Sequence, residues 1–523
     1  MRRGWPGGFP AGVVAGAGAT LALFVCRLAT GVPMPQEALT ERIALLLPNP
    51  VFAFLLAELQ HLAKPLAFAA ATCAMLIGYG LGGAAYAHIV PAGRRSRMHF
   101  GLVVAAVAWA FIEGEVLGEP LTTAVSAPIL PVAIGSLVYG TLLPGLFSRN
   151  EAANRAGAAA AAPAGRDLPA GIRPVGRRPL LRRAALMGLV AGAVSRVGIW
   201  DGDAGPRSTA TASGAAGAGP KAFRLIRGMP AEVTANREFY RVSKNFPFDP
   251  AVRIADWSFA VTGLVARPLK MSYAEFVKAA PSVERCHTLE CITNETGGDL
   301  IGNANWKGLR VRDILGLAEV RPAATAVIWR CADGYVEAVP LAVAMDARAL
   351  LAYEMNGRPL PAAHGAPVRV LLPNRYGMKQ PKWLTGIHVA DSNAAGRWER
   401  RRLANPATVK IHSAFRVDAR DGAAVELGGW AFAGSRGVAR VEISADGGTT
   451  WFPAALKEAL GDNCWQFWSA EWKPPAPGDY ALWVRAVDGA GTIQPGRRRR
   501  TPDGAEGYHE IRVRVAGRSA RRL

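Results

Sequence analysis

The stretch "TLECITNETGGDLIGNANWKG", residues 288–308, places one cysteine directly ahead of a run rich in asparagine and glycine. This stretch overlaps the end of "VERCHTLECI", residues 283–292. The composition of that segment predicts a strand that ends near Cys291. A single buried cysteine is most often a small apolar core residue. At the end of a strand, however, the pair Gly297 and Gly298 lets backbone approach a ligand closely, which favours a functional position for the thiol.

A metal site made only of protein ligands is not indicated by the cysteine and histidine spacing. Extended chain separates Cys286 and Cys291 by roughly 16 Å and points their side chains to opposite faces, so the two cannot bridge to each other. The chain has six cysteines, no Cys-x-x-Cys and no His-x-x-x-His. A zinc site of the usual protein-only kind is therefore poorly supported.

Long apolar runs occupy the first part of the chain and predict an all-α membrane region. Each is near the ~20 residues that a spanning helix needs. The arginine-rich flanks fall on one side if the segments alternate in direction, which predicts a cytoplasmic N-terminus and an external location for everything after residue 200. Arg182 and Arg183 also resemble a twin-arginine export signal, and flanking positive charge is an equal interpretation. The five runs are residues 11–30, 65–90, 100–117, 128–146 and 184–200.

Composition divides the chain into several parts. Stretches rich in Gly, Ala, Ser and Pro cannot support a core and predict linkers. The net charge of +21 lies largely in loops, linkers and the tail, and no basic stripe with interleaved aromatics occurs, which argues against nucleic-acid binding. The predicted order is four membrane helices in 1–147, a cytoplasmic basic linker at 148–183, a fifth helix or export-signal-like anchor at 184–200, a flexible linker at 201–222, an α+β domain at 223–406, a β-sandwich at 407–517 and a basic tail at 518–523.

The α+β assignment rests on mixed periodicity. The segments "VRIADWSFAVTGLV" and "TAVIWRCADGYVEAVP" predict strands, and "LRVRDILGLAEV" has helical spacing. Ser272 and Glu275 predict a capping box at the start of a helix. Asn356 and Gly357 predict a hairpin turn because both positions tolerate positive φ. After residue 407, short strands recur at regular spacing between Gly, Asp and Pro, which predicts a sandwich.

Three linked blocks carry a family resemblance: "TLECITNETGGDLIGNANWKGLRVRDIL", "LLAYEMNGRPLPAAHGAPVRVLLPN" and "YGMKQPKWLTGI". In order and relative place they resemble the sulfite oxidase family of molybdenum-cofactor enzymes. The segments "ISADGGTTW", "WQFWSAEW" and "AVDGAGTIQP" are similar to that family's immunoglobulin-like dimerisation domain. The resemblance covers roughly residues 233–515 and leaves the membrane region outside it.

The resemblance implies that Cys291 is the protein thiolate on molybdenum, with two further sulfurs from the dithiolene of the pterin cofactor. Soft thiolate donors suit such a metal. Taken alone, each of the other implied residues would be an ordinary turn residue or a solvated charge. The implied cofactor-binding residues are Asn245, Asn294, Asn303, Asn305, His364, Arg369, Lys379 and Lys382, with Tyr240, Ser243 and Lys244 as weaker candidates for the pocket rim.

Departures from the family pattern bear on the substrate. Animal and plant sulfite oxidases carry an arginine pair after the cysteine, where this chain has Glu295 and Thr296, and an active-site tyrosine where it has Leu403. These changes leave a less cationic pocket, so the sequence does not select sulfite itself. Arg375 and Arg402 are candidates to compensate.

The implied activity is oxygen-atom transfer, or its reverse, on a small oxyanion or a sulfur-containing substrate. The sequence has no Cys-x-x-Cys-His haem attachment and no iron–sulfur cysteine cluster, so electrons would pass to or from a cytochrome or a membrane redox protein. The sandwich would join two copies into a homodimer. The alternatives are a reductase of nitrate or a sulfoxide, and a non-catalytic membrane-anchored binding protein derived from this fold.

Overall fold

The computed structural model describes a defined part of the 523-residue chain. The predicted membrane segments at 100–117 and 184–200, both linkers, Arg182, Arg183, Arg402 and Leu403 lie outside the described residues. The described residues are 5–30, 34–37, 39–40, 63–89, 134–143, 146, 222–245, 248–392, 406–421, 424–501, 503–516 and 519–522.

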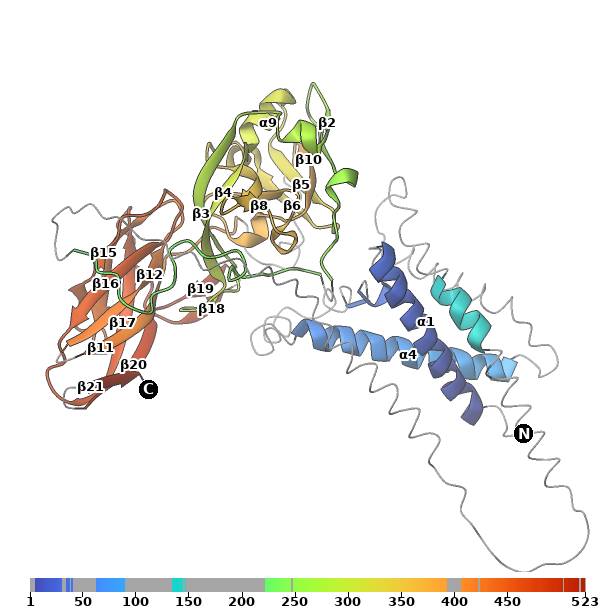
Figure 1. Ribbon diagram of the computed structural model, residues 1–523, viewed down its shortest axis with the longest axis horizontal. Coiled ribbons are helices and arrows are strands. Elements are labelled where there is room, and N and C mark those ends of the chain that lie inside the picture. The colour runs from blue at the N-terminus through green and yellow to red at the C-terminus, as the bar shows by residue number, and fades with distance from the viewer. Residues whose placement is uncertain are drawn as a thin grey trace, which may run out of the picture. The chain divides into compact units, whose positions relative to one another are not determined.

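Two long apolar helices lie near the N-terminus: α1 (Trp5–Thr30) and α4 (Ala63–Ile89) (Figure 1). They pack closely, since a Cβ at Gly12 would lie 2.3 Å from the Tyr79 carbonyl oxygen, a spacing that only glycine permits. Both are long and apolar enough to cross a membrane, and a shorter apolar helix covers 134–143 within the predicted fourth span. A signal sequence and a buried core helix have the same two properties.

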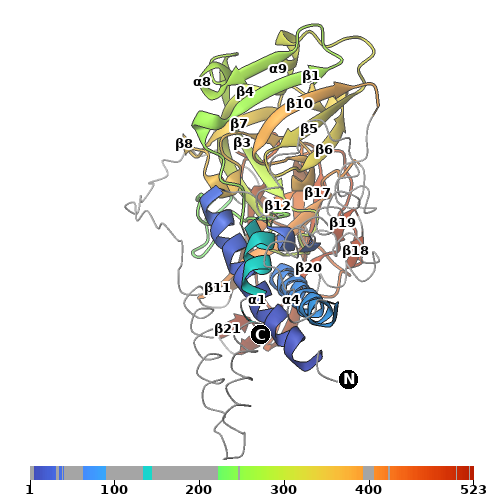
Figure 2. The same cartoon turned by 90° about the vertical axis from the view of Figure 1, so that its right-hand side faces the viewer.

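The α+β domain contains two five-stranded sheets. The first has the order β2-β1-β10-β5-β6, and Figure 2 shows β1, β10, β5 and β6 side by side. Only the β1–β10 pairing within this sheet is parallel. Its strands are β1 (Ser258–Gly263), β2 (Leu269–Ser272), β5 (Ala326–Cys331), β6 (Val336–Pro340) and β10 (Leu384–Ala390).

The second sheet has the order β3-β4-β7-β8, with β9 paired to β7. Short helical turns connect the strands of both sheets. Strands of the second sheet are β3 (Ser282–Glu290), β4 (Ile301–Arg310), β7 (Leu350–Met355), β8 (Arg358–Pro359) and β9 (Arg369–Leu371). The helices are η2 (Ile254–Asp256), α8 (Tyr273–Phe276), α9 (Val311–Leu317), α10 (Leu341–Ala344), η3 (Ala362–His364) and η4 (Gly377–Lys379).

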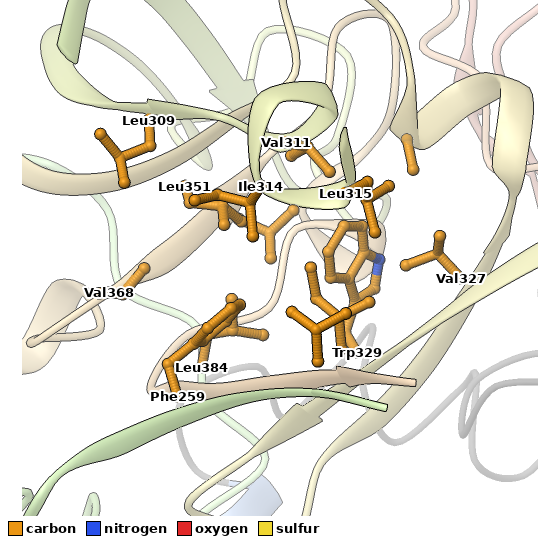
Figure 3. Close-up of a cluster of buried hydrophobic side chains, with 14 of the residues drawn as sticks. Phe259, Leu309, Val311, Ile314, Leu315, Val327, Trp329, Leu351, Val368 and Leu384 are labelled. Atoms are coloured by element: carbon orange, nitrogen blue, oxygen red, sulfur yellow. The ribbon is translucent and has the colours of Figure 1, made fainter. Parts of the chain in front are cut away.

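A shared apolar core joins the two sheets (Figure 3). Phe259 and Trp329 of the first sheet, Leu351 of the second and Ile314 of α9 are all fully buried there. The first four residues of β7 alternate, because Leu351 and Tyr353 enter this core while Leu350 and Ala352 enter another on the opposite face. The second sheet is therefore buried on both faces.

Several local predictions are confirmed. Ser272 and Glu275 form the capping box of α8, and Asn356 and Gly357 form the β7–β8 turn with φ of 52° and 71°. The predicted pair of strands in "TAVIWRCADGYVEAVP" is the β5–β6 hairpin. The strand predicted for "VRIADWSFAVTGLV" begins later than expected, because its first half forms η2.

The C-terminal domain has two antiparallel sheets around one core that includes Phe415, Leu427 and Trp468. The predicted succession of short strands after residue 407 is confirmed, and the second sheet extends into the expected tail through β21. One sheet contains β11 (His412–Asp421), β12 (Ala424–Phe432), β15 (Ala455–Leu456) and β16 (Gln466–Trp472). The other contains β13 (Val438–Ser444), β14 (Phe452–Pro453), β17 (Gly478–Asp488), β20 (His509–Ala516) and β21 (Ser519–Arg522). A separate ribbon pairs β18 (Arg499–Thr501) with β19 (Gly504–Glu506).

The two domains share an apolar interface. Ile292, Ile301 and Tyr376 of the α+β domain pack with Trp430 and Phe467 of the sandwich in one cluster. The interface places the loop that follows Cys291 against the sandwich.

Candidate functional site

Cys291 directly follows β3. Its backbone N–H donates to the Leu300 carbonyl oxygen at 2.9 Å, so pairing with the start of β4 continues one residue past the strand. Its side chain is 9% exposed, and Sγ lies 3.1 Å from Thr293 Oγ1. The predicted strand end and the loop after it are therefore both present.

One face of the second sheet gathers several of the predicted residues. Arg369 of β9 lies over the Trp306 ring of β4 with 5.2 Å from Cζ to the ring centroid. Phe239 contacts both Trp306 and His364 edge to face, at 5.7 and 5.6 Å between ring centroids. Leu289, two residues before Cys291, packs in the same cluster. Predicted positions from three separate blocks of sequence thus converge.

Arg369 is a buried cation. Its guanidinium donates to the carbonyl oxygens of His364 and Gln380 at 3.1 and 3.3 Å, and Nε has no hydrogen-bond partner among the described residues. No carboxylate within the described part of the chain forms an ion pair with it. Burial lowers the pKa of Arg369 to about 10, so it stays charged at neutral pH.

Tyr240 lies close enough to both the arginine and the cysteine to be influenced by their charges. Burial, followed by the proximity of Cys291, raises its pKa well above the ordinary value, while Arg369 acts in the opposite direction. A Cβ at Gly377 would lie 3.2 Å from the Tyr240 hydroxyl, so that glycine leaves room for the phenol. Tyr240 therefore lies within the cluster, whereas the sequence indicated it only as a weaker candidate for the pocket rim.

His364 and Lys382 are neighbours of Arg369. His364 Nε2 lies 2.8 Å from the Asn236 carbonyl oxygen, an acceptor, so this nitrogen carries a proton. Burial lowers the pKa of His364 to about 4, which keeps the ring neutral. Lys382 Nζ donates to the Ala363 carbonyl oxygen at 3.0 Å and lies over the Trp383 ring.

Two predicted asparagines lie on the opposite face of the sheet. Asn303 Oδ1 accepts from Thr288 Oγ1 at 2.8 Å, and Thr288 Oγ1 also accepts from the Trp465 backbone of the sandwich. Asn305 is paired in register with Cys286 and shares this face. Asn303 and Asn305 therefore lie on the face that meets the sandwich, opposite the face that carries Arg369.

The remaining predicted residues also have local roles. Asn294 Oδ1 accepts from the Leu300 backbone at 2.9 Å and closes the loop after Cys291. Asn245 Nδ2 lies 3.2 Å from Asp333 Oδ2. Lys379 is 1% exposed, and its Nζ lies 2.8 Å from Glu337 Oε1 in a buried ion pair. The hydrogen bonds of Asn245 and Lys379 connect them to Asp333 and Glu337. These contacts do not place either residue on the sheet face that carries Arg369, whereas the sequence predicted both to bind the cofactor.

A buried acid and base beside Cys291 were missed by sequence reasoning. Glu290 Oε1 accepts from Asn294 Nδ2 at 2.9 Å and lies 2.6 Å from His412 Nδ1. Burial acts to lower the pKa of His412, but the charge and hydrogen bond of Glu290 outweigh it and the pKa is raised. His412 comes 122 residues after Glu290 on another domain, so no local pattern connects them.

The sandwich also holds the loop. Arg416 donates to the carbonyl oxygens of Gly297 and Gly298 at 2.9 and 2.6 Å. A Cβ at Gly297 would lie 2.5 Å from the His509 ring, and φ there is 77°. Both the lack of space and the left-handed backbone therefore require glycine. We name residues 292–300 with Arg416 the clamped loop.

The residues present fit a molybdopterin cofactor. The described residues contain no group of three His, Cys, Asp or Glu able to hold a metal by themselves, so ligands from a cofactor would complete a set begun by Cys291. A buried guanidinium with an unmatched N–H suits an anionic phosphate. Arg369, His364 and Lys382 would hold that anion, and Cys291 would hold the metal.

Comparisons with known proteins identify the two domains that carry these residues. The family model for an oxidoreductase molybdopterin binding domain matches residues 246–398, and that for a Mo-co oxidoreductase dimerisation domain matches 404–515. The sulfite oxidase of Gallus gallus is 30% identical over 51% of this chain and 70% of its own length. The mitochondrial sulfite oxidase of Drosophila melanogaster is 32% identical over 42% of this chain and 46% of its own length.

A third relative is the NADH nitrate reductase of Lotus japonicus, which is 28% identical over 47% of this chain and 35% of its own length. The chain thus spans less than half of the Drosophila and Lotus proteins. The matched domains and the extent of the Gallus match together establish kinship. The chain belongs to the sulfite oxidase family of molybdenum-dependent oxidoreductases.

Proposed function

We propose that this protein is a membrane-anchored molybdenum-dependent oxidoreductase that transfers an oxygen atom to or from a small oxyanion or sulfur-containing substrate. The observation that carries the proposal is a buried arginine, Arg369, that lacks a carboxylate partner among the described residues and that lies, like Cys291, within electrostatic range of the Tyr240 hydroxyl. When bound, the molybdenum cofactor supplies the two-electron oxygen-atom chemistry.

The chain's own residues bind, orient and exclude water. Cys291 provides one thiolate, and its backbone is fixed by the Leu300 hydrogen bond. Arg369, with His364 and Lys382 near it, supplies donors for a buried anion. The apolar cluster of Phe239, Leu289 and Trp306 keeps that face dry, which strengthens each polar contact within it.

Two alternative functions are also compatible with this site. A reductase of nitrate or a sulfoxide is supported by the similarity to a plant nitrate reductase. Glu295 and Thr296, in place of an arginine pair, also favour a substrate other than sulfite. A non-catalytic binding protein is the other alternative, and the buried, unmatched Arg369 speaks against it because such a charge is costly to keep without a ligand.

The surroundings of the site are also proposed. We infer five membrane spans, with the catalytic domain outside the cytoplasm or in the periplasm, supported by the two long apolar helices α1 and α4 and by the arginine distribution. An immunoglobulin-like sandwich would make the homodimer, supported by the matched dimerisation domain. A cytochrome or membrane redox protein would exchange single electrons with the site.

The test is an assay of the full-length, molybdenum-loaded protein in both directions. Sulfite with a one-electron ferric acceptor measures oxidation, and nitrate or dimethyl sulfoxide with a reduced viologen measures reduction. The proposal expects turnover in at least one direction that Cys291→Ser abolishes. A loaded and folded protein that turns over none of these substrates, and whose metal no oxyanion or sulfoxide reoxidises, would leave the binding-protein alternative in its place.

A further inference from the structure

A second cysteine site lies at the domain interface, separate from Cys291. Cys286 is on β3, and Cys464 is in the loop before β16 of the sandwich. The two domains meet here through backbone contacts, since the Thr288 N–H donates to the Asn463 carbonyl oxygen at 2.9 Å and the Trp465 N–H donates to Thr288 Oγ1 at 2.9 Å. The residues just before and just after Cys464 are therefore fixed against β3.

The two side chains converge on one point beside Gly461. A Cβ at Gly461 would lie 3.5 Å from Cys464 Sγ and 3.8 Å from Cys286 Cβ, and Cys286 Sγ also donates to Asn303 Oδ1 at 3.3 Å. Interaction with the neighbouring Cys464 thiol lowers the pKa of Cys286, and the same interaction together with burial raises the pKa of Cys464. Neither cysteine is in a disulfide.

A cavity gives access to Cys286. It has a volume of about 250 Å³, and its lining includes Arg285, Cys286, His287, Arg348, Gly461 and Asn463 together with the carboxylates of Glu284 and Asp462. Cys286 is half-buried at its wall, whereas Cys464 is 4% exposed behind it. One thiol is thus reachable from solvent and the second is placed to react after it, which is the arrangement of an attacking and a resolving cysteine.

We propose that Cys286 and Cys464 are a redox site that closes to a disulfide between the molybdopterin domain and the sandwich. The oxidant is a small-molecule disulfide. The Cys286 thiolate attacks one of its sulfurs, forms a mixed disulfide and releases one thiol; Cys464 then loses its proton and displaces the second thiol. The cysteine pair gives up two electrons and two protons, and the oxidant becomes two thiols.

The consequence is a covalent link on the strand that leads to the metal ligand. Cys286 lies on β3, which ends at Glu290, one residue before Cys291. Closure would tie this strand to the sandwich, whose Arg416 already holds the clamped loop. Such a bond persists in oxidising compartments and is reduced in the cytoplasm. The inference does not rest on the proposed function, because it concerns thiols that the catalytic site does not use.

The experiment uses the full-length holoprotein and oxidised glutathione as the probe. The protein is reduced, freed of reductant and incubated with oxidised glutathione. Remaining thiols are then alkylated under denaturing conditions, and the protein is digested for mass spectrometry without reduction. The expected product is one cross-linked peptide pair that contains Cys286 and Cys464 and lacks two hydrogen atoms. Cys464→Ser is expected to stop at a glutathione adduct on Cys286.

Cys331→Ser is the matched control, because Cys331 is also a buried free cysteine and lies on β5 of the first sheet. This variant should keep the cross-link. The proposal is overturned if the wild-type protein retains glutathione on Cys286 with Cys464 alkylated, or if both cysteines are recovered alkylated. The wild-type result decides by itself, so the proposal stays testable even if a serine variant fails to fold.

Discussion

Arg369 carries the strongest single indication of a ligand. A buried guanidinium normally has a carboxylate or a full set of acceptors, because leaving a charge without them costs several kcal/mol. Arg369 has two carbonyl acceptors, an unmatched Nε and the face of Trp306. An anion at this position would complete its hydrogen bonds, and a cofactor phosphate is such an anion.

Replacing Arg369 should weaken cofactor retention without unfolding the protein. Arg369→Gln removes a charge-assisted hydrogen bond of about 1.5–3 kcal/mol, which corresponds to about 10- to 100-fold weaker retention. Arg369→Lys should lose less, because it keeps the charge. Pterin content per folded protein after dialysis measures the effect. Arg514→Gln, which breaks an exposed pair with Asp479, is the control, and equal pterin content in Arg369→Gln and Arg514→Gln would refute the assignment.

His287 should make the protein less stable in acid. It lies between Gln380 Oε1 and Asn463 Nδ2, and burial lowers its pKa to about 3. An unfolded histidine has a pKa near ~6.5, so the unfolded chain takes up a proton that the folded chain refuses. The stabilisation is complete above that pH and falls by about 1.4 kcal/mol per unit as pH decreases toward 3.

Chemical denaturation at pH 7, 6 and 5 measures this dependence. His287→Gln should flatten it, while His388→Gln, at a more exposed position on β10, should change it less. Identical pH slopes for wild type and His287→Gln would contradict the role given to His287.

Lys379 of η4 forms a buried ion pair with Glu337 of β6, which gives this lysine a structural role. Its Nζ donates to Glu337 Oε1 and to the Ala338 carbonyl oxygen at 2.8 and 3.0 Å, and both charged side chains are buried. Lys379→Met leaves Glu337 buried without its cation and should destabilise the fold by about 3–5 kcal/mol. Adding Glu337→Gln should recover part of the loss.

Pterin content distinguishes this structural role from cofactor binding. The molecules of Lys379→Met/Glu337→Gln that fold should hold as much pterin as wild type. Loss of pterin from a stable double variant would restore Lys379 to the cofactor site.

The clamped loop links β3 and β4 to the sandwich strand β11. Arg416→Met removes both hydrogen bonds to the Gly297 and Gly298 carbonyl oxygens, each about 1 kcal/mol or more for a charged donor. Amide hydrogen exchange of residues 293–300 should rise about 10-fold or more. Arg440→Met on β13 removes an exposed contact with Glu442 and serves as the control. Unchanged exchange in Arg416→Met would show that the apolar interface alone fixes the loop.

Local sequence patterns predicted the strands, the hairpin turn and the helix cap. They did not predict which sheet face the candidate site residues would occupy. The capping box of α8 and the turn at Asn356 and Gly357 depend on neighbouring residues. Asn303 and Asn305 sit on a strand buried on both faces, so alternation alone could not say which face meets the cofactor. His412 joins Glu290 only through the packing of another domain.

The whole chain combines an apolar N-terminal region, a molybdopterin domain and a sandwich. The proposed oxygen-atom transfer would move two electrons at once, whereas a cytochrome partner would carry one, so such a site would have to hold a reduced state between single-electron steps. The sandwich holds the residues around Cys291 through the packing of Trp430, the hydrogen bonds of Arg416 and the contact of His412 with Glu290. We therefore expect the sandwich to support the proposed site in addition to the pairing of two copies that its matched family model suggests.

The central claim is that Cys291 holds molybdenum in this chain. The most direct measurement is the molybdenum and pterin content of the full-length protein, purified from a host shown to load another molybdenum enzyme, beside Cys291→Ser and Cys331→Ser. The account predicts near-stoichiometric molybdenum in wild type and Cys331→Ser, and molybdenum that is lost or readily removed by chelators in Cys291→Ser. A folded wild-type protein with neither molybdenum nor pterin, or a Cys291→Ser protein that holds the metal as firmly as wild type, would contradict it.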